Sequence, residues 1–147
     1  MIYQFYQRRV FPHLLNQVMQ TASLMDKRRE LLLPIEGEVL EIGFGTGLNI
    51  PFYGNVDVLY ALEPNPDIYH LAIERVQHAP FHVRHVQSHA EKLPFADQSL
   101  DHIVCTWTLC SIARLDQALA EIYRVLKPTG TLHLVEHVKH PNSVKIQ

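Results

Sequence analysis

Three glycines at alternate positions follow a short apolar run in the stretch VLEIGFGTGLN, residues 39–49. Gly43, Gly45 and Gly47 lack side chains that would stiffen the chain, so the backbone there is predicted to approach a ligand closely. A phosphate-binding P-loop is excluded because no Gly-Lys-Ser/Thr follows. A dinucleotide loop has the pattern Gly-x-Gly-x-x-Gly, and its third glycine would fall on Leu48.

Two carboxylates accompany this loop along the chain. Glu41 lies just before Gly43 and would repel a diphosphate, whereas it would attract a ligand with an ammonium group or a cationic sulfur. Glu63 ends the next predicted strand, at about the 20-residue spacing where an acid accepts both hydroxyls of a ribose. S-adenosylmethionine is the common cofactor that is a nucleoside with positive groups. The alternative, two ordinary surface acids, is disfavoured at the end of a buried parallel strand.

The segments around the loop are predicted to alternate between strand and helix. Residues 1–33 are predicted as helix, in two segments, and the later helical segments fall at 48–53, 66–79 and 115–126. Strands are predicted at 38–43, 56–63, 81–88, 100–107 and 131–138. This order predicts an α/β fold, a Rossmann-like three-layer sandwich with a mostly parallel sheet. Ligands in such sheets bind beyond the carboxyl ends of the strands, where the glycine loop lies.

The last helical segment has the clearest pattern, with one apolar stripe formed by Leu115, Ala118, Leu119, Ile122 and Leu126. The basic run KRR at 27–29 lies between Asp26 and Glu30, and it is predicted to be the solvated face of a helix.

Composition and charge exclude several classes of protein. The formal net charge of −2 gives no electrostatic argument for binding nucleic acid. No window approaches the roughly 18 uninterrupted apolar residues of a membrane span, and the N-terminal stretch lacks the features of a secretory signal. Two cysteines, Cys105 and Cys110, are too few for a disulfide framework and suggest a reduced, cytoplasmic protein. His82 and His85 would point to opposite faces of a strand, so no metal site is predicted.

The motifs VLEIGFGTG, LEPNP, AEKLPFADQSLD and LKPTG resemble, in order and spacing over residues 37–138, those of class I S-adenosylmethionine-dependent methyltransferases. The chain is most similar to the small-molecule branch that includes ubiquinone/menaquinone C-methyltransferases, and VCTWTLCSI is similar to thiol methyltransferases. The resemblance implies an S-adenosylmethionine-binding domain over 37–147, with an N-terminal helical segment, residues 1–36, packed on it. It also implies methyl transfer to a small, apolar acceptor by in-line displacement, with S-adenosylhomocysteine as the product.

The resemblance also implies roles for individual residues. Residues 43–47 would approach the methionine part of the cofactor, Glu63 would hold the ribose, and the adenine would lie between residues 64–65 and the loop that starts at His89. Many relatives have an aspartate where this chain has His89, so the backbone of Ala90 is the safer contact. The residues expected to bind the cofactor are Glu41, Gly43, Gly45, Gly47, Asn49, Glu63, Pro64, Asn65, His89, Ala90, Glu91, Thr106 and Trp107.

The acceptor side is less well defined by the sequence. Residues 106–109 are expected to line the methyl group, where Trp107 either walls an apolar acceptor or packs the sheet against the next helix. Glu136 and His137 reach the carboxyl end of the fifth strand and are the candidate bases, although a strand-end histidine with a structural role is the favoured interpretation of His137.

Two further expectations concern turns and lids. Thr129 stands where relatives usually have the first of two glycines, so the bend before the fifth strand is expected to rely on positive φ at Gly130. The N-terminal helix is expected either to cover the cofactor with Tyr3, Tyr6 or Arg9 or to pack on the flank of the sheet.

Members of this class usually have seven strands, the last two in a hairpin beside the fifth, and nine residues follow Val138. The sequence is therefore expected to be a fragment, or its fifth strand to be covered by another chain in a homo-oligomer or by a partner. Two alternative functions stay open: a non-catalytic module that binds S-adenosylmethionine or S-adenosylhomocysteine as a partner subunit, and a nucleotide-dependent oxidoreductase, which Leu48 disfavours.

Overall fold

A computed structural model of the chain describes residues 19–136. Five strands form one parallel sheet in the order β3-β2-β1-β4-β5. Their bounds are Glu36–Ile42 for β1, Asn55–Leu62 for β2, His82–Val86 for β3, Leu100–Thr106 for β4 and Leu126–Val135 for β5. The strand order reverses between β1 and β4, which makes their carboxyl ends the point where a ligand is expected.

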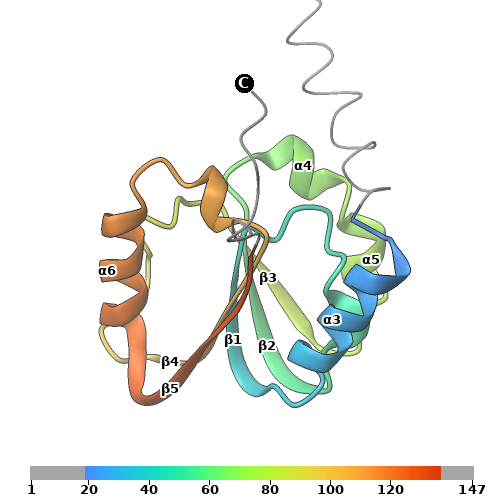
Figure 1. Ribbon diagram of the computed structural model, residues 1–147, viewed down its shortest axis with the longest axis horizontal. Coiled ribbons are helices and arrows are strands. Elements are labelled where there is room, and N and C mark those ends of the chain that lie inside the picture. Colours follow the sequence, from blue (N-terminus) through green and yellow to red (C-terminus); the bar gives the residue numbers. More distant parts are fainter. Residues whose placement is uncertain (1–18, 137–147) are drawn as a thin grey trace, which may run out of the picture.

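Helices lie on both sides of this sheet and complete three layers (Figure 1). On one side are α3 (Ala22–Leu32), α4 (Pro66–His70) and α5 (Ile73–Gln77), and on the other is α6 (Leu115–Val125). Two short 3-10 turns, η2 (Ile50–Phe52) and η3 (Leu109–Ser111), follow the loops after β1 and β4. The predicted α/β fold and its three layers are therefore confirmed.

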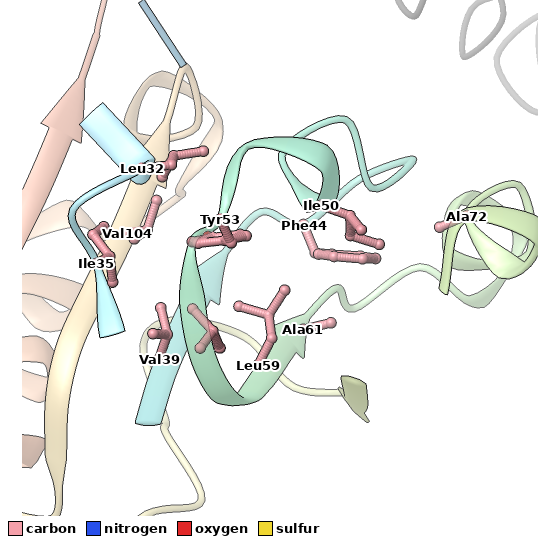
Figure 2. Packing of buried hydrophobic residues seen from close by; sticks show 11 residues of the cluster. Leu32, Ile35, Val39, Phe44, Ile50, Tyr53, Leu59, Ala61, Ala72 and Val104 are labelled. Carbon is pink, nitrogen blue, oxygen red and sulfur yellow. The ribbon is translucent and has the colours of Figure 1, made fainter. Parts of the chain in front are cut away.

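Successive residues of β1 pack into two separate hydrophobic cores, because side chains on a strand alternate between its faces. Val39 joins the cluster that includes Leu32 and Leu59, which packs under α3 and η2 (Figure 2). Leu40 joins the opposite cluster, which includes Ile122 of α6. Both strand residues are completely buried, so β1 is the central element that fixes the position of the glycine loop after it.

The predicted helix over 66–79 is interrupted at Leu71 and Ala72. There the backbone N–H groups donate three residues back, to the carbonyls of Ile68 and Tyr69, and the segment divides into α4 and α5. Ala72 is fully buried, and its Cβ lies 3.3 Å from the position that a Cβ on Gly47 would take. The interruption therefore coincides with the point where this segment packs against the glycine loop.

The fifth strand begins at Leu126, earlier than predicted, and includes the KPTG stretch. Its pairing with β4 shifts register there, from Leu100 opposite Leu126 to His102 opposite Thr131. The expectation of positive φ at Gly130 is wrong, since the described residues with positive φ do not include it. A Cβ at Gly130 would instead lie 2.8 Å from the Asp101 carbonyl oxygen, so glycine is needed for close approach between strands.

The predicted apolar stripe of α6 is only partly buried. Ala118, Ile122 and Val125 face the sheet, whereas Leu115 and Leu119 keep 39% and 42% of their surface exposed. On the same helix Arg124 donates to the carbonyls of Leu93 and Phe95 at 3.0 and 2.8 Å. That guanidinium ties the loop between β3 and β4 to α6.

Candidate functional site

The glycine loop is fastened to the carboxyl end of β2. The backbone N–H groups of Gly43 and Phe44 both donate to the Leu62 carbonyl at 3.1 Å. The next residue, Glu63, is 6% exposed, and its two carboxylate oxygens accept from the N–H groups of Gly45 at 3.1 Å and Asn65 at 3.0 Å. One carboxylate thus joins the glycine loop to the loop after β2. A carboxylate has about four acceptor positions, so both oxygens can accept further hydrogen bonds.

All three loop positions require glycine because of their backbone conformation, and Gly43 and Gly45 differ in the space around the missing side chain. Gly43, Gly45 and Gly47 have φ values of +73°, +59° and +76°, which L side chains rarely adopt. A Cβ on Gly43 would collide with the side chain of Thr108 in the loop after β4. At Gly45, apart from its chain neighbours, the only described atom within 4 Å of that position is the Gly43 carbonyl oxygen at 3.8 Å. The open side of the loop is therefore at Gly45.

A shallow hollow of about 410 Å³ adjoins the loop after β2. It brings together the predicted adenine contacts Pro64, Asn65 and His89, and it is completed by Pro66 and Asp67. Ala90 is 4% exposed and packs in the core on the α6 side. Glu91 accepts from the Arg114 N–H at 3.2 Å, and hydrogen bonds to backbone N–H groups lower the pKa of its carboxyl.

Directly beneath the glycine loop lies a network of buried polar side chains. Glu41 is 1% exposed, and its two oxygens accept from Asn49 Nδ2 at 3.0 Å and from the Tyr53 hydroxyl at 2.7 Å. The same Asn49 nitrogen donates to Thr106 Oγ1 at 3.1 Å. Burial raises the pKa of Glu41 to about 7, against the opposing effects of Tyr53, Asn49 and Arg28. Asn49 therefore contacts both Glu41 and Thr106 inside the protein, and all three are residues that the sequence placed against the cofactor.

Arg28 of α3 completes this network, so the predicted solvated face at 27–29 is wrong for its middle residue. Its side chain is 3% exposed, and Nε donates to Asn49 Oδ1 at 2.8 Å. Burial lowers the pKa of this guanidinium, while Glu41 raises it. Arg28 and Tyr53 were not among the predicted site residues. One signal was available: Arg28 lies four residues before the buried Leu32, and so on the same face of the helix.

The loop after β4 is held by the end of β5. Trp107 adopts a φ of +53°, and its N–H donates to the Val135 carbonyl at 2.7 Å. Glu136 Oε1 accepts from the N–H groups of Thr108 at 2.9 Å and Leu109 at 3.0 Å. The candidate base Glu136 therefore braces the loop that was expected to line the methyl group.

Several predicted residues lie outside the described part of the chain: the second candidate base, His137, and the lid residues Tyr3, Tyr6 and Arg9. Between residues 19 and 136, no group of three or more His, Cys, Asp or Glu side chains is arranged to hold a metal ion. No helix in that range is long and apolar enough to cross a membrane.

Comparison with known proteins adds a family to this geometry. A family model described as a methyltransferase domain matches residues 40–134. The chain is 32% identical over 142 residues to the thiol S-methyltransferase TMT1A of Homo sapiens, covering 87% of this chain but 58% of that protein. It is also 31% identical over 104 residues to the ubiquinone/menaquinone biosynthesis C-methyltransferase UbiE of Blochmanniella pennsylvanica, covering 67% of this chain and 41% of that one.

A solved structure with a similar fold is that of an S-adenosylmethionine-dependent methyltransferase from Thermotoga maritima, with a TM-score of 0.63 and 29% sequence identity. The alignment covers 90% of this chain and 60% of that one. The chain thus spans between two fifths and three fifths of the length of these three proteins.

Proposed function

This chain belongs to the family of methyltransferase domains, and from that membership we propose that the protein moves a methyl group from S-adenosylmethionine to a small, apolar acceptor. The observation that carries the proposal is the position of Glu63. Its carboxylate accepts hydrogen bonds from the N–H of Gly45, in the open glycine loop, and from the N–H of Asn65, which lines the adjoining hollow. A ligand bound across both would have a polar group at the carboxylate and a flat apolar group beside Pro64, as a nucleoside does.

The residues around Glu63 would hold the three parts of this cofactor. Glu63 would accept hydrogen bonds from the ribose hydroxyls, residues 64 and 65 and His89 would border the adenine, and the backbone of Gly43, Gly45 and Gly47 would approach the methionine part. Bound there, S-adenosylmethionine supplies a methyl group on a cationic sulfur that is already activated as a leaving group. We also keep the Ala90 backbone and Glu91, which follow His89 in the chain, as proposed contacts on the adenine side.

We assign the buried residues a supporting role. Glu41 and Asn49 hold the chain just after the glycine loop, and Thr106 joins that chain to the end of β4. They set the position of the glycine loop, where a displacement of about 1 Å can cost roughly 100-fold in rate.

The remaining residues act on the acceptor side. Trp107 walls the acceptor, and Glu136 fixes the backbone of Thr108 and Leu109 beside it. Because methyl transfer to an acceptor that keeps a proton also needs a base, Glu136 and His137 stay candidates for that step.

Thiols are the first acceptors to test, because the relative named above is a thiol S-methyltransferase. Calorimetry with S-adenosylmethionine, S-adenosylhomocysteine and NAD decides the cofactor, and turnover on apolar thiols, quinols and catechols decides the acceptor. The proposal would be overturned if neither S-adenosylmethionine nor S-adenosylhomocysteine bound. Binding without turnover on any acceptor would favour a non-catalytic module, and binding of NAD alone would favour an oxidoreductase.

Two properties of the whole protein are also proposed. Cys105 and Cys110 are both free thiols, which supports a reducing compartment such as the cytoplasm. β5 is an edge strand of the described sheet, and Leu134 on it is 43% exposed. This supports the coverage of that edge by a second copy or a partner. Light scattering on the purified protein would detect the second copy.

A further inference from the structure

The side chain of Arg28 connects three segments that are distant in sequence. Its residue number places it outside the stretch 40–134 that the methyltransferase family model matches. Nε donates to Asn49 after the glycine loop, and Nη1 donates to the Met19 carbonyl at 2.9 Å. The centre of the guanidinium lies 4.6 Å from the centroid of the Trp107 ring, in the loop after β4.

The contact with Trp107 concerns a residue with an unfavourable backbone. A φ of +53° is uncommon for a bulky residue and persists only where the surroundings hold it. The Trp107 N–H is held by Val135. A guanidinium over the face of an indole is attracted by the negative potential of the ring, and this attraction is stronger when the pair is shielded from water. Arg28 is 3% exposed and Trp107 is half-buried, so the cation is shielded from water while part of the indole is not.

The hydrogen bonds of Arg28 explain why the guanidinium is fixed. Asn49 gives its oxygen to Arg28 and its nitrogen to Glu41 and Thr106, so its amide group is oriented by three partners. Without Arg28, the bonds to Glu41 and Thr106 still hold Asn49 in place. The loss of Arg28 should therefore be felt more at the Trp107 ring than at the glycine loop.

We propose that Arg28 is a positioning residue, which holds the indole of Trp107 in the orientation that shapes the acceptor side of the site. The geometric part of this inference stands on the Arg28–Trp107 contact alone, and its kinetic part rests on the proposed function. Lysine cannot replace arginine here, because one ammonium group cannot bond Asn49, bond the Met19 carbonyl and lie over the indole ring at the same time.

The first experiment needs no ligand. Trp107 is the only tryptophan of the chain, so intrinsic fluorescence reports on its ring alone. Arg28→Lys should shift the emission maximum to longer wavelength and raise quenching by acrylamide about two-fold, as the indole loses its cover. Arg29→Lys is the matched control, since Arg29 is an exposed neighbour on α3 whose guanidinium lies 5.7 Å from the ring of Phe52 instead. Unchanged emission and quenching in Arg28→Lys would overturn the proposal.

The second experiment measures function. Arg28→Lys should raise the acceptor KM about three-fold, the effect of losing a cation–π contact. It should leave the affinity for S-adenosylhomocysteine within about two-fold of the wild type, because Asn49 keeps its other hydrogen bonds. Trp107→Leu should raise the same KM, and adding Arg28→Lys to it should cause no further rise. Additive effects, or a loss confined to cofactor affinity, would contradict a role through Trp107.

The two hypotheses fail differently. If the wild-type protein binds no adenosyl compound, the proposed function is wrong, and the fluorescence of the ligand-free variants still decides whether Arg28 orients Trp107. If Arg28→Lys does not fold, the wild-type protein decides the contact, because acrylamide quenching as strong as that of a free indole would contradict a Trp107 ring covered by Arg28. Trp107→Leu, which leaves the hydrogen bonds of Arg28 to Asn49, Met19 and Met25 in place, then tests whether the indole affects the acceptor KM.

Discussion

The Tyr53 hydroxyl donates to Glu41 Oε2 across 2.7 Å, and neither side chain is more than 6% exposed. The same carboxylate accepts from Asn49, so both of its oxygens are bonded inside the protein. Burial nevertheless dominates and raises the pKa of Glu41 to about 7. A carboxyl group with that pKa titrates within the range where enzymes are usually assayed.

Stability should therefore fall as the pH rises through this range. In the unfolded chain Glu41 loses its proton near pH 4.5, whereas in the folded protein it keeps the proton up to about pH 7. The folded state thus binds more protons between these values, and the contribution of Glu41 is fully present below pH 4.5 and lost by about pH 8. The expected loss in the free energy of unfolding is roughly 3 kcal/mol, measured by urea denaturation at several pH values.

Glu41→Gln provides the control, because glutamine does not titrate and can still accept from Asn49 and donate to Tyr53. Burial lowers the pKa of His133, which gives a change of opposite sign with pH, but that change is common to both proteins. The difference between the two pH profiles isolates Glu41. Parallel profiles would show that this carboxyl has an ordinary pKa.

Replacement of Glu63 should weaken cofactor binding. Glu63→Ala removes a charged hydrogen-bond acceptor, which should cost ~1–3 kcal/mol in affinity for S-adenosylhomocysteine measured by calorimetry. Glu74→Ala, which removes an exposed acid on α5, should have no such effect. Equal affinities of the wild type and Glu63→Ala would mean that the ribose lies elsewhere.

Alanine substitutions at two glycines of the loop should affect different properties, stability at Gly43 and ligand affinity at Gly45. Gly43→Ala places a methyl group against Thr108 at positive φ, and it should destabilise the protein by about 3 kcal/mol. Gly45→Ala has open space and should cost about 1 kcal/mol in stability, but weaken S-adenosylhomocysteine binding about 10-fold, since the methyl group occupies the ligand side.

Thermal unfolding and calorimetry separate these effects. Thr108→Ala removes two of the three atoms that collide with a methyl group at position 43, so it should recover part of the stability lost in Gly43→Ala. Equal destabilisation by Gly43→Ala and Gly45→Ala would show that the contact with Thr108 is unimportant.

Two variants of Glu136 distinguish a structural role, in which it holds the loop after β4, from a role as the catalytic base. Glu136→Gln keeps an oxygen that can accept from Thr108 and Leu109, so a brace predicts nearly unchanged kcat. Glu136→Ala removes that oxygen and should lower kcat about 10-fold through misplacement of the loop. Equal losses in both variants, with the loss of one limb of the pH–rate profile, would identify Glu136 as the base.

The sequence was most informative where a local pattern determines the structure. Strand periodicity placed β1 and β2 within a residue or two, and hence placed Glu63 at the end of β2, because each strand is defined by its own apolar residues. The spacing of the glycines located the loop, since positive φ and bare backbone are requirements that a single residue type meets.

Features that depend on distant segments could not be predicted in this way. Arg28 lies among charged residues that favour solvent, and its burial depends on Asn49, 21 residues away, and on Trp107 in another loop. The break at Leu71 likewise depends on contact between Ala72 and the glycine loop, and the role of Gly130 depends on the proximity of Asp101. In each case, the partner is set by the packing of the sheet.

The position of β1 in the middle of the sheet has a consequence for the order in which the strands pair during synthesis on the ribosome. β2 and β3 leave the ribosome soon after β1 and can pair on one side of it, but the partner on its other side, β4, ends at Thr106. Until then, the edge of β1 with Leu40 and Ile42 has no strand beside it, and these residues are fully buried only in the finished fold. We therefore expect this interval to be the one in which the nascent chain is most open to intermolecular strand pairing.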